Sequence, residues 1–202
     1  MALLTKEHIS GRLLHYNNRA TISTDQYPHF KRAAVLVTLF PKQNELYVLL
    51  TVRTNEVETH KGQISFPGGM QDKADANAMH TALREANEEL GINAESVEVL
   101  GLLDDIATPT RYIITPVVGY LQDRPTLSPN TVEVAEVIDV PLSFFSEDSN
   151  GRWEMREREG LKVKVWFFQY GQHLIWGATA MMLRNLVEIV HNHPESSELS
   201  GC

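Results

Sequence analysis

The sequence of 202 residues contains a single cysteine, Cys202, at its last position. An intramolecular disulfide is therefore excluded, and a reducing compartment is the natural expectation. Apolar runs are short as well: none approaches the ~18 residues that suggest a membrane-spanning helix. The N-terminus lacks the basic, apolar and small-residue pattern of a signal peptide. We therefore expect a cytoplasmic protein without a transmembrane segment.

Basic residues are few, with 18 Lys and Arg against 26 Asp and Glu, which gives a formal net charge of −8. General binding to DNA or RNA needs a basic footprint, so this class of function is excluded. An anionic substrate would be repelled at long range. A bound divalent cation and local bases, with Arg53, Lys61 and Arg111 as candidates, would have to reverse that field.

The length suits one domain with a sizeable core, and the hydrophobic fraction of 43% is that of a globular protein. Periodicity and turn residues predict helices over 5–17, 76–90 and 178–191. Strands are expected over 33–40, 46–52, 97–103, 112–121 and 132–140, followed by a hairpin of 153–158 and 161–168. This pattern predicts an α/β/α sandwich with a mixed sheet. Residues 1–29 would form an N-terminal helix and extension, 30–192 the main domain and 193–202 a polar tail.

Three glutamates stand where they destabilise a helix. Gly91 marks the expected end of the 76–90 helix, so Glu88 and Glu89 fall in its last turn, at the negative end of the helix dipole. Glu85, Glu88 and Glu89 also share one face and repel each other. A solvated acidic surface is the ordinary explanation, but two broken local rules at one place usually accommodate a ligand. A cation is the obvious one.

A helical wheel separates these acids from the expected packing stripe. The wheel predicts a core stripe of Met79, Ala82, Leu83, Ala86 and Leu90, with the three acids on an open, polar side. Arg84 lies four residues before Glu88 and can pair with it. The pairing would hold that carboxylate at a fixed angle.

A glycine pair precedes the helix. Gly68 and Gly69 follow Phe66-Pro67 and lead into a loop, 70–75, that ends at Asp75. A glycine loop can bring a backbone carbonyl close to an ion because no Cβ blocks the approach. Hard cations such as Mg²⁺ take oxygen ligands of this kind.

These residues together resemble a known motif. Gly69-x5-Asp75-x8-Arg84-Glu85-x2-Glu88-Glu89-x-Gly91-Ile92 resembles the Nudix box of pyrophosphohydrolases, with Asp75 in place of the usual Glu and one extra residue before the Arg. Leu49-Leu50-Thr51-x-Arg53, Gly62 and Phe66-Pro67-Gly68-Gly69 resemble the additional signature of the coenzyme A diphosphatase branch, in which that Asp and extra residue are familiar. Further matches are Thr115 to Gly119, Asn130-x-x-Glu133-Val134 and Ile175 to Ala180.

The resemblance implies a Nudix-type fold and hydrolysis of a diphosphate bond in coenzyme A or its derivatives, giving 3′,5′-ADP and 4′-phosphopantetheine. It implies Mg²⁺ or Mn²⁺ held by Glu85, Glu88, Glu89 and the Gly69 carbonyl, with Arg84 orienting the acids. Substrate contacts are expected from Arg53, Lys61, Gly68 and Gly69. Asp75, Glu133 or Glu136 could contribute from outside the helix. The base remains open, and a homodimer with the N-terminal helix as its contact is a further expectation.

Other functions compete with this one. The branch signature often carries Arg where this chain has Glu58, and an acid there would weaken attraction for the 3′-phosphate of coenzyme A. That position favours a Nudix hydrolase for another nucleoside diphosphate, such as ADP-ribose or NADH. A nucleotide-sensing Nudix module without catalysis is a second alternative, which intact metal ligands disfavour. An acidic scaffold domain is a third, and it leaves the glycine loop unexplained.

Overall fold

The computed structural model describes residues 4–16, 19–54, 62–158 and 161–191. Its α-helices are α1 (Lys6–Leu14), α2 (Ala78–Leu90) and α3 (Gly177–His191), and short 3-10 turns span η1 (Ala94–Ser96), η2 (Leu142–Ser146) and η3 (Asp148–Asn150). The main sheet contains β1 (Lys31–Lys42), β2 (Glu45–Arg53), β3 (Ile64–Ser65), β4 (Gly68–Met70), β5 (Glu98–Leu102), β6 (Ile106–Ala107), β7 (Tyr112–Tyr120) and β8 (Val134–Pro141). A second sheet contains β9 (Gly151–Arg158), β10 (Leu161–Tyr170) and β11 (His173–Trp176).

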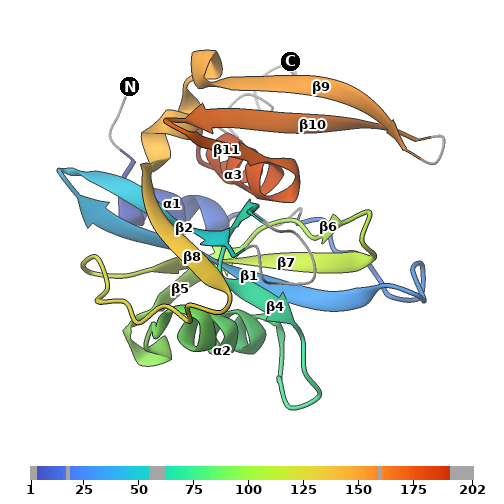
Figure 1. Cartoon of the computed structure of the whole chain (residues 1–202), viewed down its shortest axis with the longest axis horizontal. Coiled ribbons are helices and arrows are strands. Elements are labelled where there is room, and N and C mark those ends of the chain that lie inside the picture. The colour runs from blue at the N-terminus through green and yellow to red at the C-terminus, as the bar shows by residue number, and fades with distance from the viewer. Residues whose placement is uncertain (1–3, 17–18, 55–61, 159–160, 192–202) are drawn as a thin grey trace, which may run out of the picture.

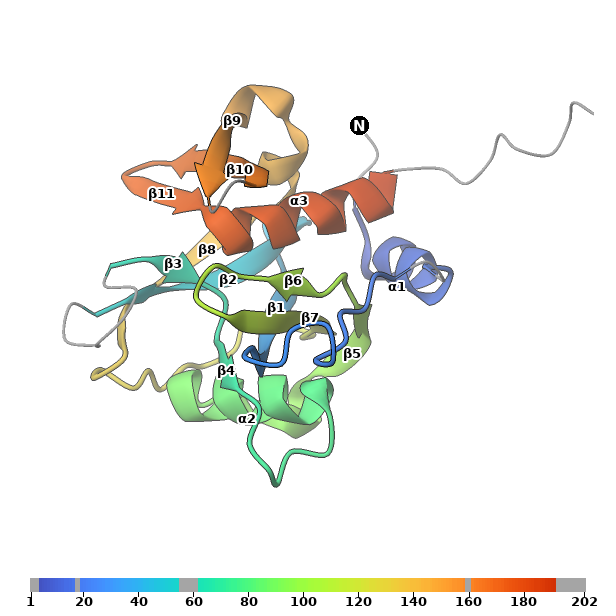
Figure 2. The ribbon, with the colours of Figure 1, turned by 90° about the vertical axis from the view of Figure 1, so that its right-hand side faces the viewer.

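The main sheet is mixed, as the sequence predicts. Its order is β3-β2-β1-β7-β5, with β4 on β1, β6 on β7 and β8 on β2. β1 and β7 run parallel, whereas the other pairs are antiparallel. Figure 1 shows α2 on one side of this sheet, with α3 and the second sheet on the other, and Figure 2 confirms the layering from the side. The predicted α/β/α sandwich is therefore confirmed.

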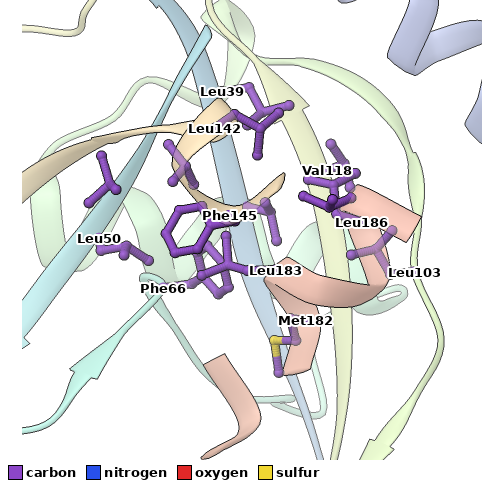
Figure 3. Close-up of a cluster of buried hydrophobic side chains, with 14 of the residues drawn as sticks. Leu39, Leu50, Phe66, Leu103, Val118, Leu142, Phe145, Met182, Leu183 and Leu186 are labelled. Carbon is purple, nitrogen blue, oxygen red and sulfur yellow. The ribbon is translucent and has the colours of Figure 1, made fainter. Parts of the chain in front are cut away.

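Side-chain alternation along the central strands builds a core on each face of the sheet. On β1, Val37 and Leu39 join the core beneath α1 and α3, whereas Leu36 and Phe40 join the core beneath α2. The period of two along a strand explains this division, because successive side chains point to opposite faces. Figure 3 shows the larger core, in which residues of α3 pack against residues of β1, β2, β7 and η2.

The long predicted elements are confirmed with small shifts of their ends. The sequence did not predict β3, β4, β6 and β11, which are two to four residues long. Such segments are too short to show a period, and β4 consists of Gly-Gly-Met, which has little intrinsic strand preference. The pairing of β4 with β1 comes from tertiary structure.

The predicted packing stripe of α2 is rotated in the structure. Its buried residues are Thr81, Ala82, Ala86, Glu89 and Leu90, whereas Met79 is 38% exposed and Leu83 is only half-buried. The prediction was wrong about Met79 and about the open side of the helix. The reason is that β4 contacts α2 beside the acids, so the side of the helix that carries Glu89 is covered.

Both ends of α2 are capped. The Asn77 side chain accepts a hydrogen bond from the His80 backbone N–H, and Gly91 ends the helix with a φ of 71°. The Ser128 N–H donates to the Leu90 carbonyl and the Asn130 N–H donates to the Glu89 carbonyl, both at 2.8 Å. The chain before β8 therefore satisfies carbonyls that a helix end would otherwise leave unpaired.

None of the described helices is long and apolar enough to cross a membrane.

Gly91 supplies a test of the cap. Gly91→Ala is expected to lower the free energy of unfolding by about 1–2 kcal/mol, because its left-handed backbone disfavours a side chain. Gly11→Ala is the matched control: that glycine lies inside α1 with nothing within 4 Å of an added Cβ, so the change should stabilise by about 0.5–1 kcal/mol. Urea denaturation measures both. Equal effects of the two changes would contradict the role of Gly91.

Candidate active site

The three acids of α2 differ in environment although they lie on one helix. The Glu88 side chain is 57% exposed, that of Glu85 is 17% exposed and that of Glu89 only 5%. Glu89 is thus a carboxyl group removed from water at the negative end of a helix. Both features disfavour its ionised form, so the local environment must offset them.

The glycine pair of β4 brings backbone against these acids. An added Cβ at Gly69 would overlap the Glu85 carboxyl group, so only glycine permits this approach. Burial raises the pKa of Glu89, and the Gly68 backbone N–H acts against this rise. β4 is fixed in turn by its antiparallel pairing with β1, where Ala34 faces Gly69. The central sheet therefore sets the position of the glycine pair relative to α2.

Arg84 is the centre of a charge network beside the acids. Its guanidinium donates to both oxygens of Asp75 at 3.1 and 3.0 Å, and to the Met70 carbonyl at 3.1 Å. The same group lies 2.9 Å from a carboxylate oxygen of Glu85 and 2.9 Å from one of Glu88. The predicted pairing of Arg84 with Glu88 is present. Arg84 therefore links the loop before α2 to two of the three acids.

Asp75 anchors this network from inside the protein. Its side chain is 1% exposed, and it also accepts hydrogen bonds from the Thr81 hydroxyl and the Asp72 backbone N–H. The hydrogen bonds from Arg84 hold the pKa of Asp75 well below its ordinary value, and Asp75 raises the pKa of Arg84. Asp75 is thus engaged as the partner of Arg84.

A second cation, Arg53, and a fourth carboxylate, Glu133, also act on the acids of α2. Arg53, at the end of β2, places a guanidinium nitrogen 3.9 Å from a Glu89 oxygen, and its buried Nε has no hydrogen-bond partner among the described residues. Glu133 precedes β8 and accepts a hydrogen bond from the Asn130 side chain at 3.2 Å. Its charge raises the pKa of both Glu85 and Glu89. Charged groups of β2 and of the segment before β8 therefore act on the acids of α2.

Burial is the main cause of the altered acidities. Loss of solvation raises the pKa of Glu89 to about 7, although Arg53 and the Gly68 N–H act in the opposite direction. Burial also raises the pKa of Glu85, and Arg84 opposes that rise. A carboxyl group with a pKa near neutrality at a polar site is typical of functional centres.

The predicted set of metal ligands is only partly gathered. Within the described part of the chain, no three Asp, Glu, His or Cys side chains are close enough to hold one ion. Arg84 takes up oxygens of Glu85 and Glu88 instead. The donors are nevertheless all oxygen, which suits Mg²⁺ or Mn²⁺, and the bare Gly69 backbone lies against Glu85. The residues therefore fit a hard divalent cation, and the assignment of ligands remains a prediction.

Other predicted residues lie elsewhere. Lys61 and Glu58 fall outside the described residues. Glu136 is exposed on β8, and its nearest ionic partner is His173 at 3.4 Å, whereas Arg111 lies at an exposed turn before β7. The sequence analysis missed Thr81, whose buried hydroxyl helps to hold Asp75, because a threonine inside a helix carries no distinct signal.

Comparison with known proteins decides the family. A family model described as "NUDIX domain" matches residues 30–168, more than half of the chain. The chain belongs to the Nudix family. It is 39% identical over 160 residues to an uncharacterised Nudix hydrolase, NudL, of Photorhabdus laumondii, covering 79% of this chain and 85% of that protein.

Two further similarities extend this result. The chain is 37% identical over 171 residues to Nudix hydrolase 15, mitochondrial, of Arabidopsis thaliana, covering 81% of this chain but only 60% of that protein. A MutT/nudix family protein from Enterococcus faecalis matches 91% of this chain and 74% of its own with a TM-score of 0.54 and 15% identity, a likeness of fold alone. As a Nudix hydrolase, the protein is a pyrophosphohydrolase.

The acidity of Glu89 predicts how stability depends on pH. The pKa of Glu89 is about 7 in the native state, whereas that of an unfolded glutamate is about 4.3. Between these two values the native state binds more protons than the unfolded state, so the free energy of unfolding falls from about pH 4 to about pH 7. In EDTA, Glu89→Gln should remove this fall and be more stable than wild type at pH 8, by up to about 3 kcal/mol. Glu88→Gln is the control, because that side chain is exposed. Denaturation at several pH values measures it, and parallel wild-type and Glu89→Gln profiles would contradict a buried Glu89.

Proposed function

We propose that this Nudix hydrolase cleaves the diphosphate bond of coenzyme A or its derivatives, giving 3′,5′-ADP and 4′-phosphopantetheine. The single observation that carries the proposal is the position of Arg53. This residue of the branch-like signature faces the Nudix-box acid Glu89 at 3.9 Å. The signature residues and the box thus meet at one place in the fold.

The pairing of β2 explains how the signature reaches the acids. Thr51 and Val52 pair with Ser65 and Ile64 of β3. The Arg53 backbone N–H then donates to the Gln63 carbonyl, and the Gly62 N–H donates back to the Arg53 carbonyl. Phe66-Pro67-Gly68-Gly69 follows directly and leads into β4, beside α2. Two segments that are separate in the sequence therefore lie beside the acids: the end of β2 beside Glu89, and β4 beside Glu85.

Each residue has a physical role in this proposal. Glu85, Glu88, Glu89 and the Gly69 carbonyl hold Mg²⁺ or Mn²⁺, and Arg84 orients Glu85 and Glu88 while Asp75 fixes Arg84. Divalent cations neutralise diphosphate charge and lower the pKa of a bound water. Arg53 adds positive charge next to Glu89, and with Lys61, Gly68 and Gly69 it contacts the substrate. Such local charge is needed because the net charge of −8 repels an anion.

The base that activates water has two candidates with support in the structure. If Glu89 is not a ligand of the cation, its pKa of about 7 suits proton transfer near neutral pH. Glu133 stands outside the helix, oriented by Asn130. Asp75 is not a candidate, because it is buried against Arg84 and Thr81.

One alternative substrate class has a specific observation in its favour. Glu58 stands where the branch signature often has Arg, and a negative charge there would disfavour the 3′-phosphate of coenzyme A. The alternative is hydrolysis of a nucleoside diphosphate that lacks this group, such as ADP-ribose or NADH.

A substrate panel distinguishes the two. With Mg²⁺ or Mn²⁺, the purified protein is expected to release 3′,5′-ADP from coenzyme A, detected by ion-exchange chromatography, and to act more slowly on ADP-ribose and NADH. Turnover of another dinucleotide without cleavage of coenzyme A would refute the coenzyme A assignment while keeping the hydrolase. Glu58→Arg then sharpens the result, since it should favour coenzyme A over 3′-dephospho-coenzyme A.

Substitution of the acids tests the chemistry separately from the substrate. Glu85→Gln, Glu88→Gln and Glu89→Gln are each expected to lower kcat/KM by at least about a hundredfold, because each removes a charge that holds the cation. Far-UV circular dichroism should show an intact fold. Glu136→Gln is the matched control and should keep wild-type turnover, since Glu136 pairs with His173. Wild-type activity in all three box variants would refute the metal assignment.

A further inference from the structure

The second sheet ends in an edge strand, β9, which has no neighbour on its outer side among the described residues. β10 lies between β9 and β11, so β9 forms its ladder on one side only. Figure 1 shows β9 as the outermost strand, with β10, β11 and α3 on its inner side. Backbone N–H and C=O groups along such an edge can pair with a strand of another molecule.

Large apolar side chains stand beside this edge. Trp153 and Met155 are 52% and 54% exposed. They face Trp166 and Lys164 across the β9–β10 ladder, so these four side chains share one face of the sheet. The Lys164 ammonium lies 4.6 Å from the Trp153 ring centroid and 4.5 Å from that of Trp166. Two neighbouring exposed residues of this size on an edge strand indicate a contact surface.

The other face of β9 carries charges of both signs. Its row contains Arg152, Glu154, Arg156 and, at the end of the strand, Arg158, and Glu154 forms ion pairs with Arg152 and Arg156. Charges commonly protect an edge strand from pairing. A row of one sign would repel a second copy of the same strand in every register. Here both signs are present, so some registers of a second copy bring like charges together and another brings opposite charges together.

A second copy of β9 is a complementary partner. In an antiparallel pair about a two-fold axis normal to the sheet, residues at equal distances from the axis face each other. With the axis at Trp153, Glu154 faces Arg152 of the other copy, which forms two symmetric pairs of opposite charge. With the axis at Met155, Glu154 faces Arg156, but Arg152 then faces Arg158, so two pairs of like charge offset the two favourable ones. An axis at Glu154 would set the two glutamates against each other and is disfavoured.

We propose that β9 pairs antiparallel with β9 of a second copy of this chain, with the axis at Trp153. The two three-stranded sheets then form one continuous sheet. Trp153 and Met155 of both copies meet on a single face and are removed from water, while Glu154 meets arginine on the opposite face. A strand pair with few side chains is a small interface, so the association is reversible and depends on concentration.

Complementary variants test this pairing. E154R makes the row basic and R152E/R156E makes it acidic, so each variant alone should self-associate at least about tenfold more weakly than wild type. An equimolar mixture should associate again, because residues 152 and 154 of the two variants then face each other with opposite charges. Sedimentation velocity over a wide concentration range measures all three samples. E188R is the matched control, an exposed glutamate on α3 paired with Arg184, and it should behave as wild type.

Hydrogen exchange locates the contact. Amide exchange in β9 should slow as the wild-type concentration rises, whereas exchange in α1 should not change. A wild-type protein that stays monomeric at the highest concentration overturns the proposal. So does a mixture of the two charge variants that fails to associate, or concentration-dependent protection elsewhere but not in β9.

Discussion

The close approach of the β4 backbone to the acids of α2 is the constraint on which the rest of the site depends. Without a Cβ at Gly69, the chain lies directly against Glu85, and the Gly68 N–H favours the ionised form of the buried Glu89. This approach removes two carboxyl groups from water beside the negative end of a helix. The arrangement is unfavourable by itself, so surrounding groups must fix and compensate it.

Compensation comes from three directions. Arg84, held by the buried Asp75, supplies positive charge to Glu85 and Glu88. Arg53 supplies it to Glu89 from the end of β2. The backbone of the segment before β8 caps the helix through Ser128 and Asn130, whereas the Glu133 carboxylate of the same segment adds negative charge and opposes this compensation. The site therefore needs the whole α2 face of the sandwich, although its charged groups come mostly from one helix.

The opposite side of the molecule is organised differently. The core beneath α1 and α3 contains the larger aromatic cluster, in which Phe144, Phe145 and Phe168 contact each other. The second sheet lies beyond it and ends at the exposed edge of β9 (Figure 1). The main sheet and α3 thus stand between the acids and the edge proposed for self-association. A charge change on β9 should leave the acid site intact, which makes the two proposals separable.

The sequence predicted the long elements because their side chains repeat with a clear period. It also singled out Glu85, Glu88, Glu89 and Arg84 as candidates, since acids at a helix end are unusual locally, whereas Arg53 became a candidate through its charge and the family resemblance. It could not predict β4, whose strand state depends on pairing with β1, nor the rotation of α2 that buries Glu89 and exposes Met79. The sequence predicted only that Asp75 could contribute from outside the helix, because its partner lies nine residues away and only the folded loop shows Arg84 beside it.

Binding of Mn²⁺ by the protein without substrate tests the central claim most directly. Electron paramagnetic resonance of free Mn²⁺ gives the affinity of wild type, Glu85→Gln, Glu89→Gln and the control Glu136→Gln. The two box variants should bind at least about tenfold more weakly than wild type, while Glu136→Gln retains wild-type affinity. Unchanged Mn²⁺ affinity in both box variants would contradict a cation site built on these buried acids.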